Sequence, residues 1–209
     1  MEKRHICIGL LAHVDAGKTT LTEALLYTTG AIRRLGRVDK KDSHFDSHEL
    51  ERSRGITIFS KQAILETFSR HITLVDTPGH VDFSAEAERV MSILDCAVLV
   101  ISSTDGIQAH TLTLWRLLES YRVPVFLFIN KMDLPVQERE KLMDQLQEQL
   151  SAGCVDFGQE FEAIAEAAAM CDEALLENYL ESGTVTEGNL RELMTKRKLF
   201  PCCFGSALK

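Results

Sequence analysis

Short apolar runs alternate with longer segments of helical periodicity along this chain. The clearest runs cover residues 6–11, 97–101 and 125–129, and polar residues follow each of them. Runs of this length, apolar at successive positions, are typical of strands that are buried on both faces of a parallel sheet. The segments between them repeat apolar residues every three or four positions, as helices that pack on a sheet do. The pattern predicts an α/β fold with a doubly wound, mostly parallel sheet.

The first half of the chain also contains a predicted hairpin. Two strand-like runs, residues 57–67 and 71–75, are joined by a short connection and are expected to form an antiparallel hairpin at the sheet edge. Asp82 is a suitable N-cap for a helix over residues 83–94. A helix after the first apolar run is expected to face inward with Leu21, Ala24, Leu25 and Thr28. The helix before the run at residues 125–129 is expected to face inward with Leu114, Leu117, Leu118 and Tyr121, and Trp115 to pack at its edge.

The segment after residue 133 is longer than a single connecting helix needs. A helix is predicted over about residues 137–150, and helical patterns follow at 161–180 and 187–198, with a break near Gly183. We interpret them as a small helical insertion that covers one end of the sheet. A packing appendage without a further role is the alternative. The last strand is expected over residues 200–205.

Composition is that of an ordinary globular domain. The chain has 209 residues, 45% of them hydrophobic and 26% charged, which is enough for one sizeable core. Its six cysteines form no Cys-x-x-Cys pair, which argues against disulfide staples or a zinc site and favours a reducing cytoplasm. No signal peptide or membrane-spanning run is visible. The net charge of −8 gives no electrostatic basis for an independent nucleic-acid site.

A candidate phosphate-binding loop follows the first apolar run. Residues 12–19 have the sequence Ala-His-Val-Asp-Ala-Gly-Lys-Thr, between a predicted strand and a predicted helix. Amides around Gly17 can point at phosphate oxygens, aided by the positive end of the helix dipole. Lys18 would bring a positive charge to the outer phosphates, and the Thr19 hydroxyl is placed to bind Mg²⁺. Because Ala12 stands where the general pattern has Gly, this motif alone also fits an ordinary strand-to-helix turn.

A long polar segment, residues 30–55, separates the first helix from the hairpin. Loops of this length in compact domains are usually functional or mobile. Its acidic, histidine-containing stretch at residues 42–49 is interpreted as a solvated loop rather than a metal site. Gly55 allows the backbone to approach a ligand. Thr57 then offers a second hydroxyl to Mg²⁺ and the terminal phosphate, with a plain strand position as the alternative.

The second strand of the hairpin ends in Asp76-Thr77-Pro78-Gly79-His80. A carboxylate at the carboxyl end of a strand, facing a phosphate loop, is where a ligand of Mg²⁺ or of its water belongs. Gly79 can offer an unhindered amide to the terminal phosphate. His80 alone would be an ordinary surface residue, but its place after this Asp-x-x-Gly motif makes it a candidate for catalysis.

The apolar run at residues 125–129 leads into Asn130-Lys131-Met132-Asp133, the strongest specificity signal in the chain. The Asp133 carboxylate can accept hydrogen bonds from the ring N–H and the exocyclic amine of guanine, donors that adenine does not present there. Because an adenine base would leave the carboxylate without these hydrogen bonds, such a site rejects it by roughly 10⁴-fold. The Asn130 amide can tie neighbouring loops to the base, and the Lys131 stem can lie over its face. These residues predict GTP as the ligand.

Together, these motifs resemble the GTP-binding domain of the translational GTPases. Residues 12–19 are similar to the loop of elongation factor G and of its relatives, the tetracycline-resistance ribosomal protection proteins. The segment Asp105-Gly106-Ile107-Gln108-Ala109 favours the protection-protein branch. The resemblance covers nearly the whole chain, and its further motifs are Arg54-Gly55-Ile56-Thr57, residues 76–80, residues 130–133 and Ser206-Ala207-Leu208.

The resemblance implies roles that sequence patterns alone do not show. His80 matches the residue that orients the attacking water once the ribosome is engaged, and Val14 and Ile56 match the apolar gate that flanks it. Asp15 matches a loop residue linked to a monovalent cation, and the Ser206 turn offers amides to the guanine carbonyl. The expected Mg²⁺ ligands are Thr19, Thr57 and Asp76. The expected GTP contacts are His13, Val14, Asp15, Ala16, Gly17, Lys18, Thr19, Thr20, Gly79, Asn130, Lys131, Asp133, Ser206, Ala207 and Leu208.

The motifs also suggest how the chain is divided. Residues 1–133 are expected to form a GTP-binding core, and residues 134–199 a connecting helix plus the helical subdomain. Residues 200–209 would return to the core as its last strand and guanine-contacting turn. Because a covering helix normally follows the last strand, the chain is expected to be an amino-terminal fragment. In elongation factor G an insertion at this point contacts the ribosomal stalk, and the shorter insertion here leaves that role open.

The predicted function is GTP binding and ribosome-stimulated GTP hydrolysis, in a ribosomal protection protein or an elongation factor G-like protein. Its partners would be GTP or GDP and, through the longer protein, the ribosome, with no membrane. A release-factor-recycling or housekeeping translocation GTPase is one alternative. A nucleotide-gated binding module with little turnover is another. A P-loop kinase would leave Asn130 and Asp133 without a purpose.

Overall fold

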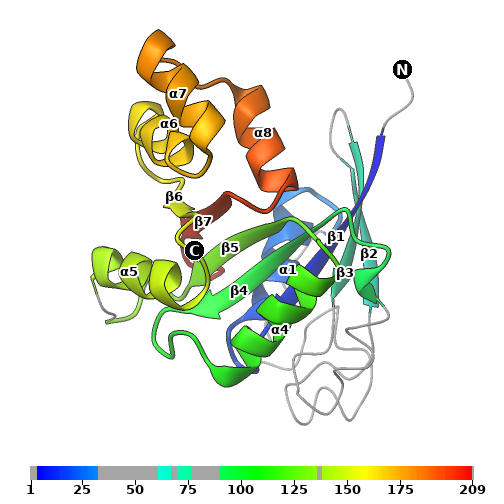
Figure 1. The fold of residues 1–209 in the computed structure, drawn as a ribbon. Coiled ribbons are helices and arrows are strands. Elements are labelled where there is room, and N and C mark those ends of the chain that lie inside the picture. Colours follow the sequence, from blue (N-terminus) through cyan, green and yellow to red (C-terminus); the bar gives the residue numbers. More distant parts are fainter. Residues whose placement is uncertain (1–3, 33–60, 67–69, 77–89, 136–137, 209) are drawn as a thin grey trace.

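A single mixed sheet forms the centre of the molecule (Figure 1). The computed structural model describes residues 4–32, 61–66, 70–76, 90–135 and 138–208. The seven strands lie in the order β2-β3-β1-β4-β5-β7-β6. Their bounds are β1 Arg4–Ala12, β2 Lys61–Glu66, β3 Arg70–Asp76, β4 Cys96–Ser102, β5 Val125–Asn130, β6 Cys154–Asp156 and β7 Phe200–Phe204.

Neighbouring strands are parallel throughout, except that β2 pairs antiparallel with β3 at one edge. This confirms the predicted fold class, a mostly parallel sheet with an edge hairpin. Strands 57–67 and 71–75 of the prediction correspond to β2 and β3, with residues 57–60 and 67 outside the described ranges. The helix predicted over residues 83–94 lies largely outside them too.

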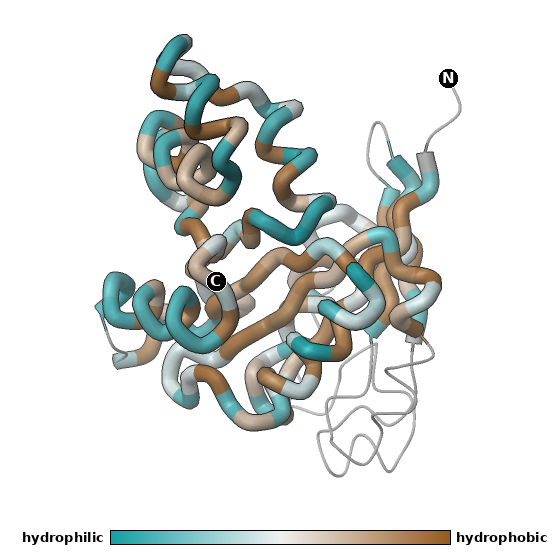
Figure 2. The backbone as a smooth tube through the Cα atoms, viewed as in Figure 1, coloured by the Kyte–Doolittle hydropathy of each residue, from teal (hydrophilic) through white to brown (hydrophobic). Residues whose placement is uncertain are grey.

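Helices cover the two faces of the sheet. Their bounds are α1 Lys18–Thr28, α4 Ala109–Ser120, α5 Arg139–Gln149, α6 Phe161–Ala169, α7 Glu173–Ser182 and α8 Glu187–Thr195. Leu21 and Leu26 of α1 join one buried cluster with Leu10 and Leu74. Residues of α4 and α5 join a second cluster, which includes Leu99. In Figure 2 the apolar residues follow the central strands, as expected for a sheet buried on both faces.

The inward faces of two helices differ in part from the predicted ones. In α1, Leu21 is buried as expected, but Thr28 is exposed and Leu26 is buried instead. Tyr121 is 41% exposed, because it is the C-cap of α4 and lies beyond its last turn. Trp115 is buried in the core and meets the Phe200 ring edge-on at 4.7 Å between ring centroids.

Helices α6, α7 and α8 form a separate group beside the β6–β7 edge (Figure 1). They enclose a third buried cluster, which includes Ile164, Ala168, Leu175 and Leu190. The prediction of one helical segment over residues 161–180 was wrong, because the helix breaks between α6 and α7. Asp172 has an extended φ of −151° and caps α7 by accepting a hydrogen bond from the Leu175 N–H at 3.1 Å. The turn lets both helices face the same small core.

Strand β6 was not predicted, because its three residues are too few to show a period. It pairs in parallel with β7 at the sheet edge. Its neighbouring residues face different cores: Cys154 joins the cluster under α4 and α5, and Val155 joins the cluster of α6–α8. Strand β6 is therefore the junction between the sheet and the helical insertion. Among the helices that the structure describes, none is long and apolar enough to cross a membrane.

Candidate functional site: a loop cluster at the carboxyl edge of the sheet

The predicted motifs gather at the carboxyl ends of the parallel strands. The phosphate-loop motif begins at the last residue of β1, and Asp76 and Asn130 are the last residues of β3 and β5. In the register of β1 and β3, Leu10 pairs with Asp76, so the acidic residue lies beside the end of β1. Ligands of open α/β sheets bind at this edge, where connections leave to opposite faces.

The turn between β1 and α1 depends on two residues with positive φ. Asp15 has φ 62° and Gly17, the N-cap of α1, has φ 94°. The first turn of α1 receives no side-chain cap, so its amides remain suited to an anion. A Cβ on Gly17 would lie 2.2 Å from the Asn130 Nδ2 atom. Glycine is thus required here both for its backbone conformation and for the close approach of Asn130.

Lys18 and Asp76 form a buried ion pair behind this turn. The Lys18 ammonium donates to the Asp76 Oδ1 atom, and their side chains are 7% and 0% exposed. Thr19, the next residue of α1, is half-buried. The residue that we assign to phosphate therefore lies in contact with the carboxylate that we assign to Mg²⁺ or its water. Among the residues described, no group of three or more His, Cys, Asp and Glu could hold a metal ion. One carboxylate and one hydroxyl suit Mg²⁺, which is usually held largely by phosphates and water.

Asn130 links the phosphate loop to the end of the chain. Its side chain is buried, and its Nδ2 group donates to the Ala16 carbonyl oxygen at 2.9 Å. Its Oδ1 atom accepts a hydrogen bond from the Ala207 N–H, also at 2.9 Å. The Met132 N–H donates to the Gly205 carbonyl oxygen at 3.1 Å, which joins the last two motifs a second time. Three motifs from distant parts of the sequence are thus held together by one amide side chain.

The residues assigned to the guanine base surround this amide. Lys131 has φ 66°, and its ammonium lies 3.8 Å from the Asp105 Oδ2 atom. Asp133 is exposed at the surface, whereas Ala207 is buried and Leu208 is 58% exposed. Because the Asp133 carboxylate is exposed, a ligand can reach it without a rearrangement of the core.

Several predicted residues lie outside the described part of the chain. They are Ile56, Thr57, Gly79 and His80, together with the acidic stretch at residues 42–49. Their predicted roles in catalysis, in the apolar gate and in Mg²⁺ binding stay predictions. Val14, the other gate residue, follows β1 and is half-buried.

The structure adds three features that the motifs did not indicate. The His13 ring lies 6.0 Å from the His110 ring, centroid to centroid, so α4 packs behind the phosphate loop. The His13 Nδ1 atom and the Ser103 Oγ atom are buried without a hydrogen-bond partner among the described residues. Asp105 was named only within the segment that favours the protection-protein branch, yet it contacts Lys131. Its place after a central strand, at the carboxyl edge, was the available signal.

Several known proteins are similar to this chain in sequence. The chain is 43% identical over 187 residues to the tetracycline resistance protein TetM from transposon Tn916 of Enterococcus faecalis, which covers 88% of this chain and 28% of that protein. It is 41% identical to TetO of Campylobacter jejuni, over 97% of this chain and 34% of that protein. The chain thus spans about a third of the length of these relatives.

A solved protein from Thermus thermophilus has the same fold, with a TM-score of 0.85 and 26% identity over 97% of this chain and 37% of that one. The family described as the elongation factor Tu GTP binding domain matches residues 3–209. Members of this family are translational GTPases, which bind GTP or GDP and the ribosome and generally use Mg²⁺. The chain belongs to the elongation factor Tu GTP binding domain family and is a translational GTPase domain.

Proposed function

We propose that this domain binds and hydrolyses GTP as part of a ribosomal protection protein. The observation that carries the proposal is the pair of hydrogen bonds of the Asn130 side chain, which donates to the Ala16 carbonyl oxygen and accepts from the Ala207 N–H. They hold the phosphate loop beside the motifs that we assign to guanine. The similarity to TetM and TetO, both described as tetracycline resistance proteins, favours ribosomal protection over the other tasks of this family.

In this proposal the phosphates lie over the first turn of α1. The amides from His13 to Thr20 and the Lys18 ammonium bind the phosphate oxygens, and Gly79 adds an amide at the terminal phosphate. Thr19 and Thr57 offer hydroxyls to Mg²⁺, and Asp76 holds the ion or its water. When bound, Mg²⁺ neutralises charge that develops on the phosphates. Lys18 would exchange part of its contact with Asp76 for the phosphates when GTP binds.

The hydrolysis step is assigned to a water molecule that His80 orients. Histidine in such a role contributes about 10²–10⁴-fold to a rate. Val14 and Ile56 would flank the ring and keep it away from the water until an outside contact moves it inward. Asp15 would bind a monovalent cation in the same loop. The domain alone is therefore proposed to bind GTP well and to hydrolyse it slowly.

The base is assigned to the cluster around Asn130. Asp133 accepts from the guanine ring N–H and amine, and the Lys131 stem covers the face of the base. Amides at Ser206, Ala207 and Leu208 meet the guanine carbonyl oxygen. Residues 1–133 and 200–209 would then form the GTP-binding core, with residues 134–199 as the connecting helix and insertion. Because the ribosome is the proposed partner, we propose that the protein acts in the cytoplasm.

A chimeric protein tests the ribosomal role with this chain as it stands. The corresponding amino-terminal third of Campylobacter jejuni TetO would be replaced by residues 1–209. We expect the chimera to restore tetracycline tolerance to a sensitive strain and to hydrolyse GTP faster on ribosomes than in solution. A matched chimera with His80→Ala should keep GTP affinity within about twofold and lose at least about 10²-fold in ribosome-stimulated single-turnover rate.

Each other outcome has a defined meaning. Tolerance without any turnover would contradict the enzymatic proposal and favour a nucleotide-gated binding module. Ribosome-stimulated turnover without tolerance would favour recycling or translocation over protection. Wild-type rates in the His80→Ala chimera would make His80 a surface residue beside a glycine.

A further inference from the structure

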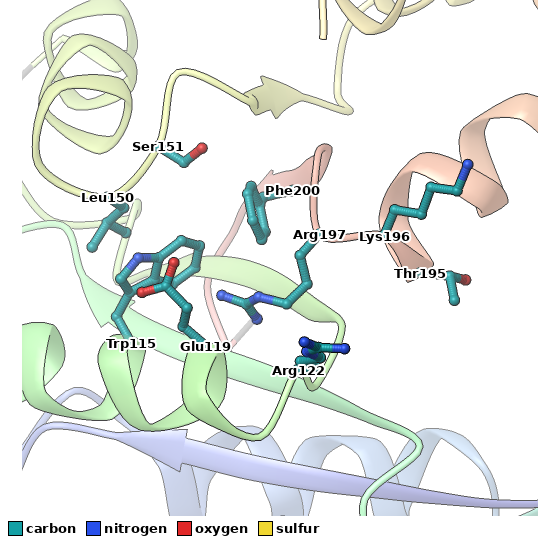
Figure 3. A pocket seen from close by; sticks show the side chains of 9 residues that line it. All are labelled: Trp115, Glu119, Arg122, Leu150, Ser151, Thr195, Lys196, Arg197 and Phe200. Carbon is teal, nitrogen blue, oxygen red and sulfur yellow. The ribbon is translucent and has the colours of Figure 1, made fainter. Parts of the chain in front are cut away.

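A cavity lies at the amino-terminal end of β7, away from the carboxyl edge of the sheet that carries the candidate GTP site. It has a volume of about 580 Å³, within the range of small-molecule sites. Trp115 and Glu119 of α4 line one side, and Phe200, the first residue of β7, forms the back (Figure 3). Its other lining residues are Arg122, Leu150, Ser151, Thr195, Lys196 and Arg197.

Arg197 is held rigidly in this cavity. Its guanidinium carbon lies 5.1 Å from the Trp115 ring centroid and 5.2 Å from that of Phe200. Its Nη1 group donates to the Val123 carbonyl oxygen. Burial lowers the pKa of Arg197 from its ordinary value, and Glu119 acts in the opposite direction. An arginine remains cationic under these conditions, so a partly desolvated positive charge faces the cavity.

The lining carries more positive than negative charge. Arg122, Lys196 and Arg197 stand against the single carboxylate of Glu119, in a chain whose net charge is −8. The Arg122 guanidinium has no ion-pair partner among the residues that the structure describes. Lys196 pairs with Glu192 at 2.6 Å, and in Figure 3 its ammonium points away from the two arginines, at the rim.

The ends of helices explain part of this charge. Arg122 follows α4, and Lys196 and Arg197 follow α8, where cations are favourable to the helix dipole. That effect does not require the cations of two separate helices to line one cavity. Of the two hydroxyls in the lining, that of Thr195 donates to the Arg191 carbonyl oxygen at 2.8 Å, whereas that of Ser151 accepts from the Gly153 N–H at 3.1 Å and can still donate to a ligand.

We propose that this cavity binds the phosphoryl group of a phosphorylated small molecule. A phosphate monoester carries a charge of about −1.5 to −2 at neutral pH and three acceptor oxygens. The two guanidinium groups and the Ser151 hydroxyl supply matching donors, and guanidinium recognises phosphate in a two-pronged geometry. The remaining volume beside Leu150 and Phe200 has room for the organic part of the ligand.

The fluorescence of Trp115 provides a direct test, because it is the single tryptophan of the chain. The protein would first be saturated with GDP and Mg²⁺ so that the phosphate loop is filled. Ribose 5-phosphate, inorganic phosphate and ribose would then be titrated separately. We expect a saturable change with ribose 5-phosphate and none with ribose. A similar response to inorganic phosphate would support recognition of the phosphoryl group alone, whereas a similar response to ribose would contradict it.

Three variants separate a binding site from cations that serve only the helix ends. Arg122→Asn removes one cation with a residue that tolerates the φ of 54° and should weaken binding by about tenfold or more. Arg116→Asn, on the exposed face of the same helix, is the matched control and should change nothing. Glu119→Gln removes the one carboxylate and should tighten binding severalfold. Equal affinity in all three variants, or no saturable signal, would overturn the proposal.

Discussion

At the scale of single residues, the contact between Gly17 and Asn130 explains why the site needs both. Gly17 leaves room for an amide that reaches the Ala16 carbonyl, and the same amide holds Ala207. The segments that we assign to phosphate and to the base are thereby positioned against each other before a ligand arrives. Such preorganisation lowers the cost of ordering loops on binding.

Replacing Gly17 with alanine tests whether its conformation or its close approach to Asn130 matters for binding. The new Cβ would lie 2.2 Å from the Asn130 Nδ2 atom, and the alanine would have to adopt φ 94°. The left-handed conformation costs about 1–2 kcal/mol of folding stability at any such position. Because the clash would also displace the Asn130 amide from the Ala16 carbonyl, we expect at least about tenfold weaker GTP binding by fluorescent nucleotide titration. Gly30→Ala is the control, since Gly30 has φ +74° but no atom within 4 Å of the new Cβ. Its stability should fall with GTP affinity unchanged; an equal loss of affinity in both variants would contradict a specific contact with Asn130.

Asp133→Asn should change the choice of base. The carboxylate accepts from the guanine amine in our proposal, whereas an amide can donate to the oxygen that replaces this amine in xanthine. We expect weaker GTP binding and a preference for xanthosine triphosphate, measured by competition between the two nucleotides. Because Asp133 is exposed, its substitution should leave the fold intact, and a thermal melt of the variant checks this. An unaltered preference for GTP would remove Asp133 from the base site.

The residue motifs could be predicted because short-range chemistry determines them. A loop that binds phosphate needs Gly17 and Lys18 at adjacent positions, whatever the rest of the fold is. The contact of Lys131 with Asp105 and the packing of His13 against His110 could not be predicted in this way. Both join segments that are far apart in sequence, and their geometry depends on how α4 lies against the phosphate loop.

At the scale of elements, the helical insertion shows where periodicity is insufficient. The pattern over residues 161–180 contains no proline or glycine, so one helix was a reasonable prediction. The break arises from Asp172, whose side chain caps α7 and also pairs with Lys198 beyond α8. A local cap and one long-range ion pair, neither of which shows in the apolar periodicity, therefore decide where α7 begins. The short strand β6 is likewise defined only by its partner β7.

Substitutions of Asp172 should separate its capping role from its charge. Hydrogen bonds from Lys198 and from the Leu175 N–H lower the pKa of Asp172 from its ordinary value. A carboxyl with a lowered folded-state pKa stabilises the fold above its unfolded pKa, and this contribution is lost as pH falls through the folded pKa. At pH 7 we expect the urea midpoint to fall in the order wild type, Asp172→Asn, Asp172→Ala, because asparagine still caps a helix.

The pH dependence provides the control for this series. The difference between wild type and Asp172→Asn should shrink as the pH falls below about 3.8, the ordinary pKa of this group. Asp144→Asn, on the exposed face of α5, should match wild type at pH 7. A wild-type advantage over Asp172→Asn that did not shrink at all as the pH fell below about 3.8 would show that the charge of Asp172 is not its source.

At the scale of the whole molecule, the fold follows from the alternation of apolar runs and helical periods. Each central strand was visible as a run that is apolar at successive positions, and the carboxyl edge followed from the parallel arrangement. The insertion was predicted to be helical, but its separate core was not, since a core depends on which faces meet. Leu199 joins the core of the insertion and Phe200 joins the core of the sheet, so one peptide bond marks the second crossing between them.

This division predicts that nucleotide binding will stabilise the two parts unequally. A ligand that binds only the folded state adds about 2.7 kcal/mol at a concentration of 100 Kd, which is about 100-fold in amide protection. The gain should reach amides of β1, β4 and β5, which lead into the candidate site and open only with the sheet. Amides of α6, α7 and α8 should gain much less, because their core can open without breaking the two hydrogen bonds of the Asn130 side chain, with the Ala16 carbonyl and the Ala207 N–H. Hydrogen exchange with and without GDP and Mg²⁺ measures both groups in one experiment, and Gly17→Ala should reduce the protection gained at the same GDP concentration. A uniform gain across strands and insertion would instead mean that the sheet and α6–α8 unfold as one cooperative unit.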